Sequence, residues 1–172
     1  MINEVIKYLE KNRLQPNIQL MSIEYIKNKA KEINAIEYLE IGLFNGYSAL
    51  QMSLVCNVTS IEIDKKNIEM AKENIKEANV KNINIIKGDA IEKLTELAKI
   101  KKTFDIILID AKKSEYKKYL ELSLKVIKKG FIYADNTISH KENMKDFFVY
   151  LEENKLKWKE LEIGRGVVEI KI

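Results

Sequence analysis

The chain has 172 residues, of which 46% are hydrophobic and 33% charged, and its formal net charge is +4. This composition excludes a disordered tail and a collagen-like repeat, and no apolar run approaches the roughly 18 residues that a membrane span needs. The length allows one sizeable core, so we expect a single domain. The only cysteine, Cys56, cannot form an internal disulfide, and residues 1–15 lack the apolar segment of a secretory signal. We therefore expect a cytoplasmic protein that does not bind membranes.

Two helices are predicted before the main body of the chain. Apolar residues recur at helical spacing over residues 2–11 and 22–33, and the segment between them holds the only proline, Pro16. We therefore expect residues 1–34 to form a helical appendage to a core of residues 35–172.

The rest of the chain alternates between strand-like and helix-like segments. Short runs rich in Ile, Val and Tyr predict strands over residues 36–41, 58–63, 83–87, 104–109 and 131–134. Amphipathic stretches predict helices over residues 46–56, 65–78, 90–100, 114–128 and 141–154. This alternation is typical of βαβ units, which give a parallel sheet with helices on both faces. Residues 158–163 and 167–172 flank Gly-Arg-Gly and predict a closing hairpin. The expected fold class is therefore α/β and Rossmann-like, with a mostly parallel seven-stranded sheet and a C-terminal antiparallel hairpin.

Polar residues follow the predicted strands at the end where open parallel sheets bind ligands. They are Glu40, Gly42, Glu62, Asp64, Gly88, Asp89, Asp110, Asp135 and Asn136. Each acid alone could be a helix N-cap or a first-turn charge that complements the helix dipole. Their collection at one sheet edge favours a ligand site.

The turn after the first predicted strand contains two glycines, Gly42 and Gly46, where a dinucleotide-binding turn has three. Gly42 allows a ligand to approach the backbone closely, and Gly46 lets the next helix begin against the strand. Glu40 would repel a phosphate but attract an ammonium or sulfonium group, which favours S-adenosylmethionine over NAD. Glu62 is placed to accept hydrogen bonds from the ribose of either cofactor, and Asp89 from an adenine amino group.

Residues 36–172 resemble the class I S-adenosylmethionine-dependent methyltransferases, and more narrowly the catechol and caffeoyl-CoA O-methyltransferase family with its bacterial members. The motifs that carry the resemblance are LEIGLFNGYSAL, IEID, GDA, IDAKKSEY and ADN, in this order. It implies that Glu40, Gly42, Phe44 and Ser48 hold the methionine part of the cofactor, Glu62 the ribose, and Asp89 with Ala90 the adenine. Gly46 and Asp110 complete the expected cofactor site.

The same resemblance implies a divalent cation held by Asp110, Asp135 and Asn136. The order of elements agrees, because Asp110 follows the fourth strand and the other two residues follow the fifth, and one crossover places these strands side by side. Oxygen donors suit Mg²⁺, with Mn²⁺ or Ca²⁺ as alternatives. Lys113 aligns with the catalytic lysine of the family, the general base for a hydroxyl group chelated by the metal, so Lys113 and Asp110 are the expected catalytic residues.

Two features depart from the family pattern. Lys112 stands where bacterial relatives often have an acid, and we expect either a solvated charge or a contact to an anionic substrate. Only residues 137–140 separate Asn136 from the next helix, where relatives usually have a longer segment that walls the substrate pocket. The short segment favours an open site, better suited to a large or exposed acceptor than to an enclosed small ring. A small hydroxylated molecule and 5-hydroxyuridine in tRNA, whose phosphates could meet the lysines, both stay open as acceptors.

Several alternatives stay open from the sequence. A homodimer is one, and a noncatalytic S-adenosylmethionine-binding protein and an NAD-dependent oxidoreductase are others. His140, the only histidine, is expected at the surface, with contact to the substrate as the alternative. By the resemblance, the terminal hairpin would place Arg165 at the rim of the site.

Overall fold

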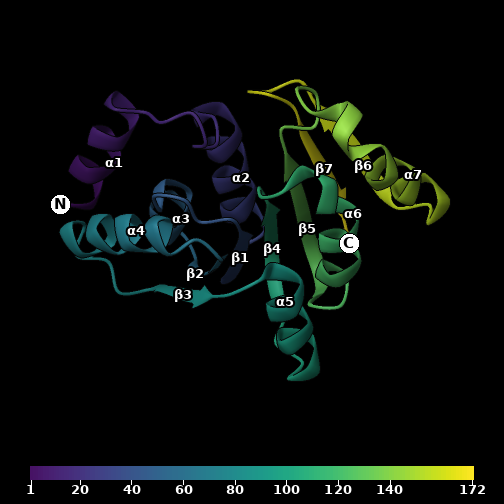
Figure 1. Ribbon diagram of the computed structural model, residues 1–172, viewed down its shortest axis with the longest axis horizontal. Helices are drawn as coiled ribbons and strands as arrows, with labels where there is room; N and C mark the ends of the chain where they lie inside the picture. Colours follow the sequence, from purple (N-terminus) through teal and green to yellow (C-terminus); the bar gives the residue numbers. More distant parts are fainter.

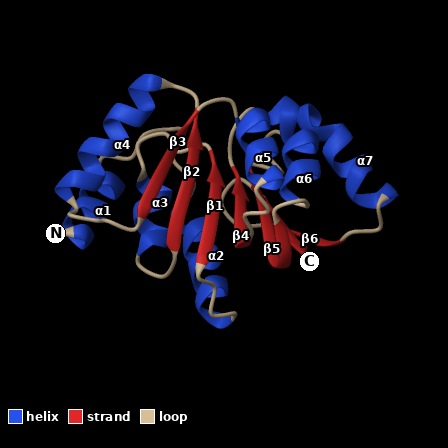
Figure 2. Ribbon diagram, turned by 90° about the horizontal axis from the view of Figure 1, so that it is seen from below, coloured by secondary structure: helices blue, strands red, loops and turns tan.

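One seven-stranded sheet with helices on both faces organises the computed structural model, which describes residues 1–172 (Figures 1 and 2). The strands are β1 (Glu37–Ile41), β2 (Asn57–Glu62), β3 (Ile83–Lys87), β4 (Phe104–Ile109), β5 (Ile127–Asp135), β6 (Lys157–Leu161) and β7 (Val167–Lys171). The α-helices are α1 (Ile2–Lys11), α2 (Leu20–Glu32), α3 (Tyr47–Ser53), α4 (Lys65–Glu77), α5 (Ala90–Lys99), α6 (Tyr116–Ser123) and α7 (Lys145–Glu153), and two 3₁₀ turns occupy Lys113–Glu115 and Lys141–Met144. None of these helices combines the length and the apolar content that crossing a membrane requires.

The strand order is β3-β2-β1-β4-β5-β7-β6, with β1 to β5 parallel and β7 antiparallel to both of its neighbours. The predicted fold is therefore confirmed. The chain runs outward from β1 to β3 and then returns to place β4 on the other side of β1. The strand order thus reverses between β1 and β4, which is where open α/β sheets bind their ligands.

Alternate residues of the central strands point to opposite faces of the sheet. On β4, Ile106 and Leu108 join a buried cluster with apolar residues of α1 to α4, while Ile107 and Ile109 join another with α5 to α7. All four side chains are almost completely buried, and each such burial stabilises the fold by roughly 1.5–3 kcal/mol. Figure 2 shows the two helix layers on either side of the strands.

The N-terminal helices share the core of the sheet. The hydrophobic cluster that contains Tyr38 of β1 also contains residues of both helices: Val5, Ile6 and Leu9 of α1, and Ile23 and Ile26 of α2. This packing brings the loop between α1 and α2 to the edge of the molecule that carries the site.

The helix predicted over residues 114–128 is present as α6, but the prediction extended it too far towards the C-terminus. Helix α6 ends at Ser123, and β5 already begins at Ile127. The strand predicted over residues 131–134 lies within β5, but residues 127–130 were missed because two exposed lysines and a glycine follow Ile127. Gly130 has φ +137°, and a Cβ there would lie 1.9 Å from the backbone oxygen of Asp105, so this glycine allows β5 to pass close to β4 where their register shifts. The helix predicted over residues 46–56 likewise ends early, at position 53.

Candidate active site

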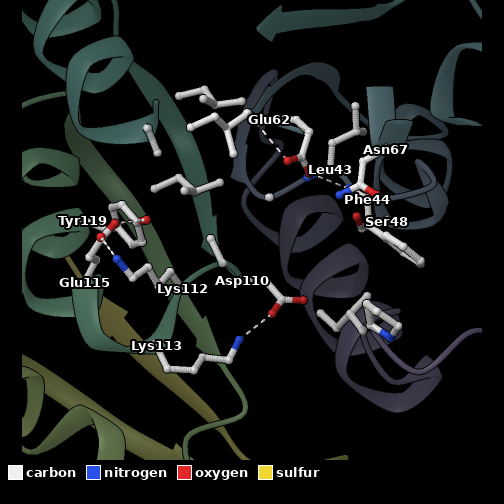
Figure 3. Close-up of a pocket in the computed structure, with 18 of the residues that line it drawn as sticks. Leu43, Phe44, Ser48, Glu62, Asn67, Asp110, Lys112, Lys113, Glu115 and Tyr119 are labelled. Carbon is white, nitrogen blue, oxygen red and sulfur yellow. Dashed lines mark hydrogen bonds and ion pairs between the residues drawn. The ribbon is translucent and has the colours of Figure 1, made fainter. Parts of the chain in front are cut away.

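A cavity of about 760 Å³ opens at the carboxyl ends of β1, β2, β3 and β4, a volume typical of small-molecule sites (Figure 3). Its walls come from the turns that follow these four strands and from the start of α3. Three more segments complete it: the loop between α1 and α2, the residues after β5, and the turn between β6 and β7.

The turn after β1 is shaped by a close approach to β4. Gly42 has φ +98°, and a Cβ at this position would lie 2.1 Å from the backbone oxygen of Asp110. Phe44, which also lines the cavity, has φ +49°, a conformation that bulky residues rarely adopt and that is often found at functional sites. Gly46 begins α3 in the left-handed conformation and packs near Ala71 of α4. It does not line the cavity.

Glu62 ties the turn after β1 to the end of β2. Its Oε2 accepts hydrogen bonds from the backbone N–H groups of Leu43 and Phe44 at 3.2 and 3.0 Å, and its Oε1 accepts two more at 2.9 Å from Ile63 and Asp64. A carboxylate offers about four acceptor sites, and all are used here. Ribose hydroxyls would have to share or replace these bonds.

Asp89 is the N-cap of α5, and its Oδ1 accepts from the N–H groups of Ile91 and Glu92 at 2.9 and 3.1 Å. The capping role that the sequence left open is therefore present. Asp89 and Ala90 also line the cavity, so capping does not exclude contact with a ligand.

Glu40 lies completely buried beneath the site instead of lining it. Ser60 Oγ donates to Glu40 Oε1 at 2.7 Å, and Tyr38 Oη donates to Oε2 at 3.3 Å. Burial raises the pKa of Glu40 to about 7, although these hydrogen bonds and one from Ser48 oppose the shift. Ser48 itself lines the cavity.

Lys113 and Asp110 form an ion pair at the cavity wall, visible in Figure 3. Lys113 Nζ lies 2.9 Å from Asp110 Oδ1, and it also donates to Tyr116 Oη at 2.7 Å. Tyr116 is fully buried and donates in turn to the backbone oxygen of Asp135 at 3.2 Å. The lysine nitrogen is thus held in a fixed position by two side chains.

Asp135, the last residue of β5, and Asn136, which follows it, form the next part of the site. The Asp135 side chain is buried; its Oδ2 accepts from Asn136 Nδ2 at 3.0 Å, and its Oδ1 has no hydrogen-bond partner. Burial, and then the charge of Asp110, raise the pKa of Asp135 to about 7. Asn136 lines the cavity and Asp135 does not. No group of three or more His, Cys, Asp or Glu side chains that could hold a metal is found in the chain. The expected set contains only two such residues, Asp110 and Asp135, and its third member is an asparagine.

Lys112 also lines the cavity, but 69% of its side chain is exposed. Its Nζ lies 2.5 Å from Glu115 Oε1, and Glu115 Oε2 accepts from Tyr119 Oη at 2.6 Å. The two lysines after Asp110 therefore differ in their surroundings, because only Lys113 contacts an expected metal ligand.

The structure brings most of the expected residues to one cavity. Gly42, Phe44, Ser48, Glu62, Asp89, Ala90, Asp110, Lys113 and Asn136 line it, whereas Glu40, Gly46 and Asp135 lie behind its walls. Sequence reasoning did not find Asn17, Asn67 or Tyr119, which also line it. No local pattern marks them, since each reaches the site only through the tertiary fold. His140 and Arg165 line the cavity as well.

Comparison with known proteins agrees with this geometry. An Arabidopsis thaliana protein with the provisional name caffeoyl-CoA O-methyltransferase is 36% identical over 149 residues, which cover 79% of this chain and 64% of that protein. A flavonoid 3',5'-methyltransferase of Vitis vinifera is 34% identical over 139 residues, which cover 72% of this chain and 59% of that protein. The chain thus spans less than two thirds of the length of these relatives.

The solved structures include a Staphylococcus aureus protein, also provisionally named caffeoyl-CoA O-methyltransferase, with a TM-score of 0.85 and 26% identity over 99% of this chain and 92% of that one. A sequence model of the O-methyltransferase family matches residues 3–154. This match covers most of the chain, from α1 to the end of α7, and the chain therefore belongs to the O-methyltransferase family.

Proposed function

We propose that the protein transfers the methyl group of S-adenosylmethionine to a hydroxyl group held near Lys113. Membership of the O-methyltransferase family supports the reaction class. The observation that carries the location is the single cavity in which Gly42, Phe44 and Glu62 face the ion pair of Asp110 and Lys113. In this proposal the cofactor lies along Gly42, Phe44 and Glu62, and the acceptor lies beside the ion pair.

Glu40, Glu62 and Asp89 give the cofactor side of the cavity a negative character. The sulfonium and ammonium groups of S-adenosylmethionine are cations, and the buried carboxyl of Glu40 lies behind Ser48 at this wall. Ionised Glu40 favours a cation there, while NAD would bring two phosphates towards the same carboxyl. This charge argues for S-adenosylmethionine and against the NAD-dependent alternative.

Asp110, Asp135 and Asn136 fit a divalent cation. The buried Oδ1 of Asp135 lacks any hydrogen-bond partner, a costly arrangement that a cation would relieve. Oxygen donors of this kind suit Mg²⁺ or Mn²⁺. When bound, such an ion lowers the pKa of an acceptor hydroxyl and orients two neighbouring oxygens.

Lys113 takes the proton of the acceptor hydroxyl. In the structure its Nζ donates to Asp110 and Tyr116 as an ammonium group, so it must separate from Asp110 and release one proton to solvent before it can act as a base. With a cation held by Asp110, Asp135 and Asn136, Asp110 would no longer pair with Lys113, while Tyr116, anchored on the backbone oxygen of Asp135, keeps the nitrogen in place. The methyl group then passes to the hydroxyl oxygen, and the proton remains on Nζ.

The acceptor is a small molecule with two adjacent hydroxyl groups. The names of the relatives refer to caffeoyl-CoA and to flavonoids, and such acceptors suit a cavity of about 760 Å³. Methylation of 5-hydroxyuridine in tRNA is the second candidate, favoured by the short segment after Asn136 that leaves the site open.

The test incubates the protein with S-adenosylmethionine that carries a labelled methyl group and with Mg²⁺, offering 3,4-dihydroxybenzoate in one series and undermodified tRNA in another. Lys113→Met should lower kcat by about 100-fold or more, the usual contribution of a general base, and leave the Kd for S-adenosylhomocysteine within about threefold. Asp110→Asn or a chelator should also abolish turnover. Lys118→Met is the matched control, because this lysine pairs with Glu121 outside the cavity.

Two results would contradict the proposal. Full activity of Lys113→Met would show that Lys113 is not the general base. Full activity in the presence of a chelator would show that the reaction needs no divalent cation. Binding of S-adenosylmethionine without transfer to any acceptor would instead support a noncatalytic binding protein.

A further inference from the structure

The two arginines of the chain converge on one place. Of its 30 lysines and arginines only Arg13 and Arg165 are arginines, yet both line a small cavity of about 90 Å³ that adjoins the main one. Arg165 lines both cavities. Arginine differs from lysine in its planar fork of N–H donors, which matches the two oxygens of a carboxylate or phosphate.

The turn that carries Arg165 is clamped from two sides. A Cβ on Gly164 would lie 2.6 Å from Ser22 Oγ in α2, and one on Gly166 would lie 2.4 Å from the backbone nitrogen of Ile138. The backbone oxygen of Arg165 accepts from the N–H groups of Ile138 and Ser139, each at 3.1 Å. The turn between β6 and β7 therefore fills the space between the start of α2 and the segment after Asn136, and Figure 1 shows it reaching towards α2.

Neutral groups hold the Arg165 side chain in place. Its Nη2 donates to Gln15 Oε1 at 2.6 Å, and its Nη1 lies 3.5 Å from the backbone oxygen of Gln15. Arg13 is held in a similar way, because its Nη2 donates to the backbone oxygen of Asn17 at 3.3 Å and its guanidinium lies 5.1 Å from the centre of the Tyr47 ring.

Neither guanidinium forms a salt bridge, although the charge of Arg165 opposes the rise in the pKa of Asp135. Twelve ion pairs form in the structure, and none of them involves either arginine. Lys112 and Lys113, which also line the main cavity, are already paired with Glu115 and Asp110. The rim of the acceptor side thus presents fixed guanidinium groups with unused hydrogen-bonding capacity.

We propose that Arg165, with Arg13 beside it, binds an oxyanion of the acceptor, either a carboxylate or a phosphate ester. This inference rests on the proposed methyl transfer and names its substrate class: a small dihydroxylated aromatic acid or phosphate in place of a neutral catechol. The hydroxyl groups of this acceptor reach Lys113, and its anionic group reaches the rim.

The test uses pairs of acceptors that differ only in charge. 3,4-Dihydroxybenzoate is compared with 3,4-dihydroxybenzamide, and 3,4-dihydroxybenzyl phosphate with 3,4-dihydroxybenzyl alcohol. For each pair the kcat/KM of the anionic acceptor is divided by that of its neutral partner. The pair with the larger ratio shows whether the site binds a carboxylate or a phosphate. The wild-type protein should prefer one anionic acceptor over its neutral partner by about tenfold or more in kcat/KM. Arg165→Gln should reduce this ratio to about one without changing kcat/KM for the neutral partner by more than about threefold. Arg165→Lys should fall between, because it keeps the charge and loses the fork.

The control is Lys125→Gln, which removes an exposed, unpaired lysine outside both cavities and should leave the ratios unchanged. Equal kcat/KM values within both pairs, or ratios unchanged in Arg165→Gln, would overturn the inference and leave the proposed function standing. So would an Arg165→Gln effect seen with tRNA and with neither acceptor pair.

Calorimetry separates the two proposals. In the presence of S-adenosylhomocysteine, 3,4-dihydroxybenzoate should bind more tightly than 3,4-dihydroxybenzamide, and Arg165→Gln should weaken its binding about tenfold. This result would support the oxyanion site even if no methyl transfer occurred. Circular dichroism of Arg165→Gln checks folding, and Arg165→Lys, which retains the aliphatic stem, keeps the comparison valid if that variant unfolds.

Discussion

Replacing Glu40 with glutamine should change how the stability of the protein depends on pH. The Glu40 carboxyl is completely buried and receives hydrogen bonds from Ser60 and Tyr38. Burial raises its pKa from 4.5 to about 7, and the charge of Asp110 adds to the shift. Glu40 forms no salt bridge, and the main groups that favour its ionised form are the hydroxyls of Ser48, Ser60 and Tyr38.

The direction of the effect follows from proton linkage. Because the folded-state pKa lies above the unfolded value, folded Glu40 keeps a proton that the unfolded chain releases between about pH 4.5 and 7. The free energy of unfolding therefore falls as pH rises through this window. A shift of about 2.5 units corresponds to about 3 kcal/mol. Glutamine carries no titrating proton, so Glu40→Gln should lack this loss.

Urea unfolding of both proteins from pH 5 to pH 8 measures the effect. The stability of Glu40→Gln relative to wild type should rise by about 2.5 kcal/mol between pH 5 and pH 8, since part of the loss in wild type already occurs below pH 5. Glu73→Gln, which removes an exposed acid of α4, should show a difference that does not vary with pH. A constant difference for Glu40→Gln as well would refute the reasoning, because it would mean that Glu40 titrates normally in the folded protein.

Two further substitutions test the hydrogen bonds of the site. Glu62→Gln places an amide NH₂ against two of the four backbone N–H groups that now donate to Glu62. It should lower the free energy of unfolding by about 2–4 kcal/mol, measured by thermal unfolding at pH 7. A loss below about 1 kcal/mol would argue against these hydrogen bonds. Tyr116→Phe removes the hydroxyl that lies between Lys113 and the backbone oxygen of Asp135. It should lower kcat by about tenfold and change the free energy of unfolding by only about 1 kcal/mol. An unchanged kcat would mean that Tyr116 does not position the lysine.

The sequence predicted the sheet and its ligand-binding edge because both depend on short, local patterns. The apolar runs at residues 83–87 and 104–109 match β3 and β4 to the residue. Site residues that directly follow such a strand, among them Gly42, Asp89 and Asp110, reach the cavity because the strand fixes where they emerge. A motif attached to a strand end therefore predicts position well.

Burial and long-range contacts could not be predicted in the same way. Glu40 and Asp135 are the last polar groups of their strands, and the sequence does not say whether such a side chain faces the cavity or the interior. The start of β5 was missed because two exposed lysines and Gly130 follow Ile127, and the pairing with β4 depends on this glycine. The wall at Asn17 depends on how α1 and α2 pack on the sheet, which no local pattern records.

The acids of the site fall into two physical groups, and the difference bears on what the cavity binds. Glu62 and Asp89 are stabilised by backbone N–H groups, so they are satisfied without a ligand. Glu40 and Asp135 are buried with too few donors, and each has its pKa raised to about 7. A buried carboxylate of this kind gains most from a nearby positive charge. Glu40 lies behind the turn after β1 and Asp135 lies beside Asp110, so a positive charge would stabilise each end of the cavity, in agreement with the sulfonium cofactor and the divalent cation that we propose there.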